Sequence, residues 1–339
     1  MLPLPDDRIA DEPGERRDAA RLLVIERGSG RIRHQTVADL PELLDANDLL
    51  VFNRSRVQPA LTWLRKATGG RVELIWVEEV EPGLWRVFGG TRKLRSGLRL
   101  FGEGLEVEVV ERGGRFATLR VVDGPPIATW LEAHGAPPLP PYIRRRRRAQ
   151  GLAEVRDEDY SRYQTVYASE NGSIAAPTAG LHFTPELLER LATAGVAAAE
   201  VTLHVGPGTF TEVTPKEVEQ VEVLPERASI PEETARALQQ GRRVIAVGTT
   251  AARTLEALGV RARDGGVAVD GLADLTIRPG HTFRIVEGLL TNFHLPGTTL
   301  RLLVAALLGP ERMLEAYQAA IAHDGYRFYS YGDAMLILP

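Results

Sequence analysis

A series of short runs with period-two patterning between residues 61 and 122 constrains the fold of this chain more than any other feature. In RVELIWVEEV, Val72, Leu74 and Trp76 share one face, and Glu73 and Ile75 lie on the other. LEVEVVE (105–111) and FATLRVV alternate in the same way, and glycine pairs separate the runs. Because this alternation is typical of antiparallel strands joined by tight turns, the pattern predicts a small barrel or sandwich.

The remainder of the chain alternates helices and strands. TPELLERLATAG (184–195) and PEETARALQQG each combine a helix-start signal, an apolar stripe and a final glycine. A strand RVIAVG (243–248) and a helix TAARTLEALG follow. This order predicts an α/β layer with a largely parallel sheet. The predicted fold class is therefore α/β: an α/β layered domain, residues 1–60 and 150–339, with an inserted antiparallel β-barrel domain at 61–149.

The composition excludes several classes of chemistry. The 339 residues include no cysteine, which excludes disulfides, thiolate nucleophiles and cysteine-ligated metals. No apolar run approaches the roughly 18 residues of a membrane span, and the first twenty residues lack an apolar signal core. We therefore expect a cytoplasmic protein with no membrane partner. The net charge of −4 argues against bulk binding of nucleic acid, although all but three of the 41 basic residues are arginines.

Familiar motifs for nucleotide, metal and serine chemistry are absent from the sequence. There is no GxxxxGK phosphate loop, no GxGxxG motif after a strand and no GxSxG motif. The seven histidines form no HxH or HxxxH pair. Without such a pair and without cysteine, no metal site is expected.

Three short strings rich in small and polar residues lie at predicted strand ends or helix starts: AAPTAGLHF (175–183), VTLHVGPGTF (201–210) and AVGTTAARTLE (246–256). Their glycines allow close approach to the backbone, and helix starts offer N–H donors. Because ligands of α/β sheets bind at the carboxyl ends of strands, we expect the three strings to meet in one shared cleft. The structural alternatives are a helix-capping role for His182 and a satisfied core position for His204.

Two further strings carry polar groups near the end of the chain. TNFHLPGTT (291–299) offers Asn292 and His294, and YRFYSYGDAM (326–335) offers aromatic rings and Asp333. These groups can present hydrogen bonds, a carboxylate and stacking surfaces to a ligand. Aromatic residues near a chain end are more often part of a core, so packing is the alternative here.

Five consecutive arginines at 144–148 follow the proline-rich segment APPLPPYI, which marks the boundary between the two predicted domains. Such a run is either a solvated, mobile segment or a patch that neutralises phosphates. The second possibility allows local RNA binding by a chain whose overall charge is negative.

Taken together, the strings resemble one family. DLLVFNRSRVQPA, LPPYI, YQTVYA, AAPTAGLHF, TLHVGPGTF, RVIAVGTTAARTLE, LLTNFHLPGTTL and YRFYSYGDAM occur in this order across residues 20–338. This set is similar to the S-adenosylmethionine:tRNA ribosyltransferase-isomerase family of the queuosine pathway. The resemblance implies an α/β domain with an inserted β-barrel. It also implies transfer and isomerisation of the ribosyl group of S-adenosylmethionine onto 7-aminomethyl-7-deazaguanine at the tRNA wobble position. The products would be epoxyqueuosine, adenine and methionine.

The resemblance also implies a set of site residues and partners. The titratable groups inside matched strings are candidates for the general base and acid: His182, His204, His294 and Asp333. Candidates for holding S-adenosylmethionine are Thr178, Gly180, Gly206, Gly208, Thr249, Thr250 and Asn292. Candidates for RNA contacts are Asn53, Arg56, Arg144, Arg145 and Arg146, with the rest of the arginine run. S-adenosylmethionine is consumed as a co-substrate, no other cofactor is implied, and a monomer is expected.

One segment departs from the family pattern. Members typically carry H-x-M-H-x-E after the GTF string, whereas this chain has Val221 and Leu224 at the two histidine positions and keeps Glu226. Two alternatives follow. A catalytically impaired tRNA-binding paralogue of the family would bind tRNA without releasing adenine. A different S-adenosylmethionine-dependent enzyme, such as a methyltransferase, is disfavoured because no glycine-rich loop follows an early strand.

Overall fold

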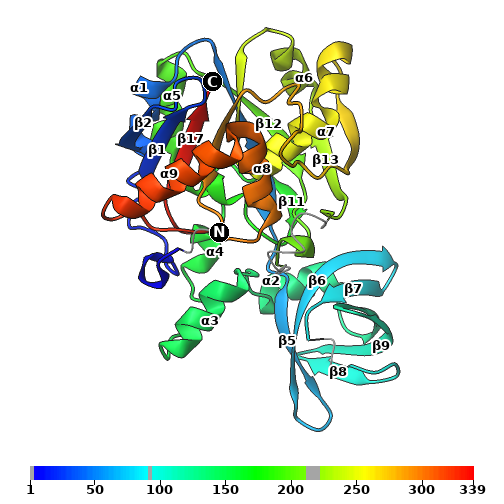
Figure 1. Cartoon of the computed structure of the whole chain (residues 1–339). Helices are drawn as coiled ribbons and strands as arrows, with labels where there is room; N and C mark the ends of the chain where they lie inside the picture. Colours follow the sequence, from blue (N-terminus) through cyan, green and yellow to red (C-terminus); the bar gives the residue numbers. More distant parts are fainter. Residues whose placement is uncertain (1–3, 91–93, 211–221) are drawn as a thin grey trace.

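The computed structural model describes residues 4–90, 94–210 and 222–339. Its centre is a nine-stranded sheet with the order β15-β13-β12-β3-β14-β16-β17-β1-β2 (Figure 1). The strands of this sheet are β1 (Arg21–Glu26), β2 (Ile32–Thr36), β3 (Asp48–Asn53), β12 (Ala197–Leu203), β13 (Glu226–Ile230), β14 (Arg243–Val247), β15 (Val269–Ala273), β16 (Gly288–Asn292) and β17 (Ala334–Leu338). A separate two-stranded sheet pairs β4 (Ser55–Val57) with β11 (Glu170–Ser173).

The main sheet is mixed, whereas the sequence pattern predicted a largely parallel one. The pairs β12–β3, β3–β14, β14–β16 and β17–β1 are parallel, and the remaining pairs are antiparallel. The prediction was wrong on this point, because β13 runs antiparallel to β12, β15 to β13 and β17 to β16. Strand β17 does so although helices α8 (Thr299–Leu308) and α9 (Pro310–Ala322) connect it to β16. As a result, one edge of the sheet is formed by the C-terminal ends of β12, β3, β14 and β16. The N-terminal ends of β17 and β1 lie at the same edge.

The sheet is buried on both faces. Along β1, Leu22 and Val24 pack into one hydrophobic cluster, while Leu23 and Ile25 pack into another. The helices around the sheet and its loops are α1 (Leu40–Leu43), α4 (Asp159–Arg162), α5 (Pro185–Thr193), α6 (Glu232–Leu238), α7 (Thr249–Gly265), α8 (Thr299–Leu308) and α9 (Pro310–Ala322). Helix α5 contributes Leu187 to the first cluster, and α7, α8 and α9 contribute to the second. A layered α/β arrangement follows from this two-sided burial.

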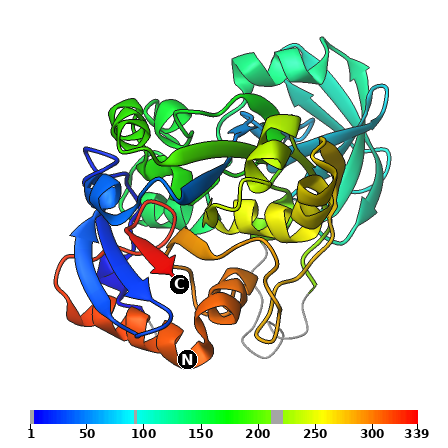
Figure 2. The same ribbon diagram turned by 90° about the horizontal axis from the view of Figure 1, so that it is seen from above.

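Six antiparallel strands close into a barrel beside this layer, on the side of α6 and α7 (Figure 2). They are β5 (Leu61–Lys66), β6 (Arg71–Glu81), β7 (Leu84–Phe88), β8 (Arg99–Gly102), β9 (Leu105–Gly113) and β10 (Phe116–Asp123). The inward residues Val72, Leu74 and Trp76 are almost fully buried, as the alternation predicted. Helix α2 (Ile127–His134) lies against the barrel, where Trp130 donates a hydrogen bond to the carbonyl of Glu103 at 2.7 Å.

The arginine run is an ordered helix and not a loose segment. Helix α3 (Pro141–Ala149) turns Arg144 and Arg147 into the protein. Arg147 is 0% exposed and forms two hydrogen bonds to the Asp159 carboxylate, at 2.6 and 3.1 Å. Arg144 pairs with Glu73 on β6 at 2.8 Å, which ties α3 to the barrel. The solvated-segment alternative is therefore wrong for these two arginines, because both side chains are buried and paired with carboxylates.

The predicted α/β class with a barrel is confirmed by this architecture. The limits at 61 and 149 stay a prediction, since helices α2 and α3 contact the barrel while the chain is already returning to the layered domain. Among the described residues, no helix is both long enough and apolar enough to span a membrane.

Candidate functional site

Two hollows open along the same edge of the nine-stranded sheet. The larger one, here called the cleft, has a volume of about 820 Å³ and lies between the barrel and the ends of β12 and β14. The smaller one, here called the arginine pocket, has a volume of about 400 Å³ and lies at the starts of β17 and β1. The prediction of one shared cleft was wrong: VTLHVGPGTF and AVGTTAARTLE meet in the cleft, whereas AAPTAGLHF contributes to the arginine pocket. The order of the strands separates the two hollows, because β12, β3 and β14 are neighbours in the sheet, whereas β17 and β1 lie further along it.

The barrel forms one wall of the cleft. Trp85 on β7 and Phe116 on β10 line it, and Arg86 beside them pairs with Glu78 at 2.8 Å. The opposite wall comes from the layered domain and contains Gly206 and Gly208. The cleft thus combines aromatic faces with exposed backbone, a surface suited to a flat heterocyclic ligand.

His204 is the candidate base in the cleft whose ring is not held by the protein. It follows β12 and does not lie within the strand, in contrast to the prediction. Among the described residues, neither ring nitrogen has a hydrogen-bond partner, and Nδ1 is buried. Burial lowers the pKa of His204, with Glu170 opposing the effect. The ring is therefore neutral near pH 7, and its tautomer is left to the ligand.

Gly172 sets the position of this ring. It has φ +141°, and a Cβ at this residue would lie 2.5 Å from His204 Nδ1. Only a residue without a side chain allows the backbone of β11 to pack this close to the imidazole. The small two-stranded sheet therefore supports His204 from behind.

The N-terminus of α7 faces the cleft through Thr249 and Thr250. Gly248 precedes the helix with φ 91°, and no side chain of the described residues caps the first turn. The N–H groups of this turn therefore present the positive end of the helix dipole to a ligand.

Asn53 supports this helix start, although the sequence placed it among the RNA contacts. It is 0% exposed, and its amide donates to Thr250 Oγ1 at 3.2 Å and to the carbonyl of Leu203 at 3.1 Å. Its oxygen accepts hydrogen bonds from the N–H groups of Ser55 and Leu203. We correct its role from RNA contact to positioning residue, because a fully satisfied, buried amide has no group left for RNA.

Glu226 and Arg253 form the floor of the cleft. The Glu226 carboxylate accepts a hydrogen bond from the Gly206 N–H at 2.7 Å and pairs with the Arg253 guanidinium. Arg253 also donates to the carbonyls of Leu224, Ala273 and Leu275. Burial raises the pKa of Glu226, and the hydrogen bonds from Gly206 and Arg253 oppose this shift. The pair fixes the glycine loop, so the backbone N–H of Gly206 is already occupied.

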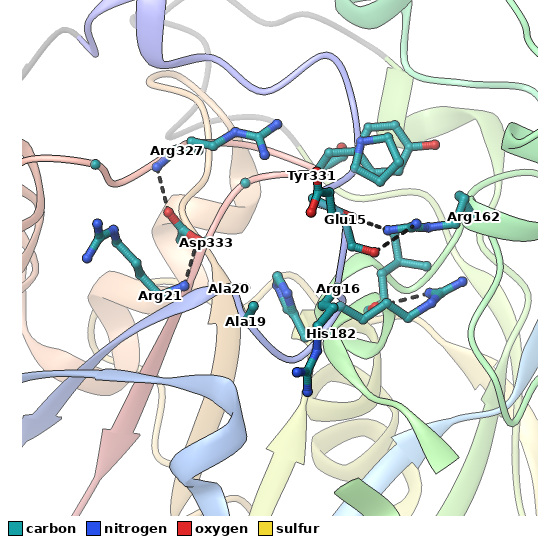
Figure 3. A pocket seen from close by; sticks show the side chains of 17 residues that line it. Glu15, Arg16, Ala19, Ala20, Arg21, Arg162, His182, Arg327, Tyr331 and Asp333 are labelled. Carbon is teal, nitrogen blue, oxygen red and sulfur yellow. Dashed lines mark hydrogen bonds between the residues drawn. The ribbon is translucent and has the colours of Figure 1, made fainter. Parts of the chain in front are cut away.

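The arginine pocket has a different character. Arg16, Arg17, Arg21, Arg162 and Arg327 line it together with two carboxylates, those of Glu15 and Asp333. Figure 3 shows the Asp333 carboxylate between the backbones of Arg21 and Arg327, whose N–H groups donate to it at 2.7 and 2.6 Å. Burial raises the pKa of Asp333. Since both oxygens already accept backbone hydrogen bonds, Asp333 holds two chain segments together.

His182 borders the arginine pocket, but the protein holds its ring on both sides. Nε2 lies 3.2 Å from the Asn292 amide nitrogen, and a second hydrogen bond joins the ring to the backbone of Arg17. Burial lowers the pKa of His182 to about 4. Asn292 also donates to the carbonyl of Tyr329 at 3.0 Å. His182 and Asn292 thus join β16 to the N-terminal segment, and the capping role considered for His182 falls to Thr184, which accepts from the Leu187 N–H.

Three further candidates line neither hollow. His294 is buried, its Nε2 lies 2.8 Å from Thr291 Oγ1, and burial lowers its pKa to about 3. Gly180 is packed so tightly that an added Cβ would lie 1.9 Å from the Tyr167 hydroxyl. Thr178 begins the short 3-10 helix Thr178–His182. Thr178 and Gly180 shape the AAPTAGLHF turn, and His294 is held by Thr291 after β16, so a structural role describes all three residues best.

The predicted RNA-contacting arginines differ in exposure. Arg56 on β4 and Arg145 on α3 are exposed, and Arg146 is half-buried, 3.8 Å from Asp11. Arg144 is buried against Glu73 and Glu154. Exposed Arg56 and Arg145 remain candidates for RNA contact, while Arg144 serves the contact between α3 and the barrel.

The comparisons with known proteins give one answer. The family model for queuosine biosynthesis proteins matches residues 2–337. The chain belongs to this family. A Thermus thermophilus protein named S-adenosylmethionine:tRNA ribosyltransferase-isomerase is 51% identical over 350 residues, which cover 99% of this chain and 97% of that protein. The protein of the same name from Anaeromyxobacter sp. strain K is 48% identical, with the same two coverages.

A solved structure extends this likeness to three dimensions. The crystal structure of an S-adenosylmethionine tRNA ribosyltransferase from Thermotoga maritima is 35% identical, covers 99% of both chains and has a TM-score of 0.54. The predicted family and fold class are therefore confirmed. So is the expectation of an enzyme: this queuosine biosynthesis protein is a member of a transferase family that modifies tRNA.

Sequence reasoning missed several residues of both hollows. Trp85 and Phe116 lie in strands whose alternation marks only the barrel, so nothing local shows that they border the cleft. Arg17 and Arg162 are separated by more than a hundred residues, and no motif joins them. Glu226 was noted as a retained family residue, but its partner Arg253 was not singled out.

Proposed function

We propose that this queuosine biosynthesis protein transfers the ribosyl group of S-adenosylmethionine onto 7-aminomethyl-7-deazaguanine at the tRNA wobble position and isomerises it. The products are epoxyqueuosine, adenine and methionine. We propose further that the cleft is the site of this reaction. The observation that carries this assignment is His204, a neutral imidazole with no partner among the described residues, in a cleft large enough for two reactants. The names of the relatives support the substrates.

Charge favours the cleft over the arginine pocket as the place for S-adenosylmethionine. With its sulfonium, amino and carboxylate groups, this co-substrate carries net positive charge near pH 7. Among the described residues, four carboxylates and three arginines line the cleft, whereas five arginines and two carboxylates line the pocket. A cation is attracted to the first and repelled by the second.

The helix start of α7 offers a place for the electron-rich parts of the co-substrate. Thr249 and Thr250 present hydroxyl and N–H groups there, and Asn53 orients the Thr250 hydroxyl. We assign this turn to the methionyl carboxylate or to the adenine nitrogens, both of which accept hydrogen bonds. Gly206 and Gly208 leave room for the ribose beside them.

His204 is the proposed general base. The positive sulfonium acidifies the neighbouring ribose C5′–H, so a neutral base beside that carbon can remove the proton. The ring is neutral near pH 7 because burial lowers its pKa. His182 and His294 are less suited to this step: two hydrogen bonds hold the ring of His182, and His294 is buried outside the cleft with its Nε2 against Thr291.

The barrel supplies a surface for the modified base. Trp85 and Phe116 expose aromatic faces to the cleft, and RNA-binding proteins stack unpaired bases on such faces. A wobble base turned out of the anticodon loop would then lie across from His204. No metal or redox cofactor is proposed; among the described residues, no group of three or more His, Asp or Glu side chains could hold a metal ion.

The departure from the family segment falls on the cleft wall. Leu224 is 55% exposed and lines the cleft, while Val221 lies outside the described residues. The retained Glu226 has a positioning role through Arg253 and Gly206. Because His204 and α7 are intact, we propose that the chain is active without the two histidines.

The decisive test is adenine release from S-adenosylmethionine with tRNA carrying 7-aminomethyl-7-deazaguanine. The control is the same tRNA with guanine at the wobble position. We expect adenine with the modified tRNA alone, matched by epoxyqueuosine in its nucleoside digest. Binding of both substrates without adenine at any enzyme concentration would replace this proposal with the impaired tRNA-binding paralogue, which the names of the relatives do not favour. The cytoplasmic location and the monomeric state stay predictions.

A further inference from the structure

The arginine pocket contains more positive charge than the protein compensates. Arg17 donates to the carbonyls of Leu181 and Ser161 at 3.0 and 2.9 Å, and Arg327 donates to the carbonyl of Glu12. These partners are backbone carbonyls, which satisfy N–H groups without neutralising a charge. Over the described residues, Arg17, Arg21, Arg162 and Arg327 form no ion pair with a carboxylate, in contrast to Arg16, which lies 3.2 Å from Asp18.

The arginines are held close to one another despite their like charges. Burial lowers the pKa of Arg17, and so does the nearby charge of Arg162. The Nε of Arg162 is buried and has no hydrogen-bond partner among the described residues, while its two terminal nitrogens donate to the carbonyls of Gly14 and Glu15. Arg21 makes no side-chain hydrogen bond among the described residues, yet its backbone is fixed by Asp333. Guanidinium groups gathered around a hollow with open donors are typical of a site for a phosphate.

The position of the pocket indicates which phosphate. It shares the sheet edge with the cleft: β3 ends beside the cleft floor, and Arg21 begins β1 four places further along the sheet. Four strand spacings are roughly 19 Å at about 4.8 Å each. A few nucleotides of an anticodon loop can span this distance, so a base in the cleft leaves a neighbouring backbone phosphate within reach of the pocket.

We propose that the arginine pocket binds a backbone phosphate of the tRNA while the wobble base occupies the cleft. This inference rests on the proposed function for the identity of the RNA, but it assigns a separate site with its own residues. The pocket contributes affinity and orientation, which are independent of base sequence, and the cleft reads the base.

Arg21→Gln and Arg327→Gln test the proposal, singly and together. Arg21→Gln removes a charge without a described side-chain hydrogen bond, and Arg327→Gln leaves the backbone contact with Asp333 in place. Arg312→Gln is the matched control, because Arg312, like Arg327, is half-buried and donates to a backbone carbonyl, that of Gly28, but lines neither hollow. Thermal melting of each variant establishes that it is folded.

The dissociation constant of tRNA is measured by fluorescence anisotropy over a range of salt concentrations, with modified and unmodified wobble positions. We expect each pocket substitution to weaken binding about fivefold and to reduce the slope of log K against log salt by about 0.7. Unchanged affinity and slope, equal to those of Arg312→Gln, would overturn the proposal.

Inorganic phosphate provides a second measurement. It should compete with tRNA in the parent protein and compete less in the double variant. If the double variant loses phosphate competition but keeps the parental affinity for tRNA, the pocket binds a free phosphate and the RNA assignment is wrong. Arginine-dependent tRNA binding without adenine release by the parent would support the pocket and reject the proposed reaction, so the two failures are distinguishable.

Discussion

The cleft and the arginine pocket lie at the same edge of the sheet, but the arginines that line them have different partners. In the cleft, Arg253 pairs with Glu226 and Arg86 with Glu78, so two of its three arginines are paired with carboxylates. In the pocket, Arg17, Arg162 and Arg327 donate to backbone carbonyls, and Arg21 makes no side-chain hydrogen bond among the described residues. The first arrangement suits a positively charged small molecule and the second a polyanion. Under the two proposals above, one edge of the sheet receives two substrates of opposite charge at separate places.

The histidines of the two hollows differ in the same way. His182 is clamped between Asn292 and the backbone of Arg17, whereas His204 has no ring partner among the described residues. An imidazole that is hydrogen-bonded within the protein has a structural role, whereas an imidazole without such partners can accept or donate a proton. The comparison can therefore be tested through reaction rate, stability and pH dependence.

The largest expected effect is on the rate. His204→Ala should slow adenine release about a thousandfold, because general-base catalysis typically contributes two to four orders of magnitude. Melting temperature should change little, since the ring makes no described hydrogen bond. His134→Ala, at an exposed histidine beside Trp130, is the control. A rate within a few-fold of the parent would remove His204 as the base and leave the cleft without one.

The next effect is on stability. Arg253→Met should lower the free energy of unfolding by about 3 kcal/mol, because it leaves the buried Glu226 carboxylate without its cation. Arg327→Met in the pocket should cost less than about 1 kcal/mol, since Arg327 forms no direct ion pair with a carboxylate of the described residues and Asp333 keeps its two backbone hydrogen bonds. Urea denaturation measures both. Equal losses in the free energy of unfolding would show that carboxylates compensate the charges of the cleft arginines and of the pocket arginines to the same extent.

A smaller effect concerns pH. The pKa of His182 is lowered to about 4 by burial, so the unfolded chain binds a proton more readily than the folded one between about pH 6.5 and 4. Its contribution to stability is complete above pH 6.5 and is lost as the pH falls toward 4, which amounts to roughly 2 kcal/mol by pH 4.5. His182→Gln should flatten this part of the stability profile, measured by urea denaturation at each pH. A profile equal to that of the parent would contradict the buried, neutral ring.

The smallest effect is expected at Leu224, where this chain departs from the H-x-M-H-x-E segment of the family. Leu224 is exposed at the cleft wall, so Leu224→His should change stability by less than about 0.5 kcal/mol. Adenine release should stay within about threefold of the parent, because His204 already supplies a neutral base. Leu272→His is a matched control at another exposed leucine that lines the cleft. A large gain in rate specific to Leu224→His would show that this chain lacks a group that the reaction needs.

Local patterns predicted most elements, and they did so for a physical reason. The alternation in 71–80 and 105–111 follows from burial on one side of a strand, and the stripe in 184–195 follows from burial on one side of a helix. Each pattern repeats within a few residues, so it is visible without knowledge of the fold. The strings shared with the queuosine biosynthesis family were equally visible, and the family match confirms them.

The grouping of those strings was not visible, because strand order joins residues that no local pattern connects. The sheet places β14 beside β3 and β17 beside β1, and so divides the predicted single cleft into two hollows. Side-chain partners were not visible for the same reason. Asp159 pairs with buried Arg147, and Asn292 forms a hydrogen bond with His182, although the residues of each pair are separated in sequence. The sequence alone therefore determined the elements, the α/β class with a barrel and the family. Only the tertiary structure decided which histidine has no ring partner and which arginines form no ion pair among the described residues, since both depend on contacts between distant segments.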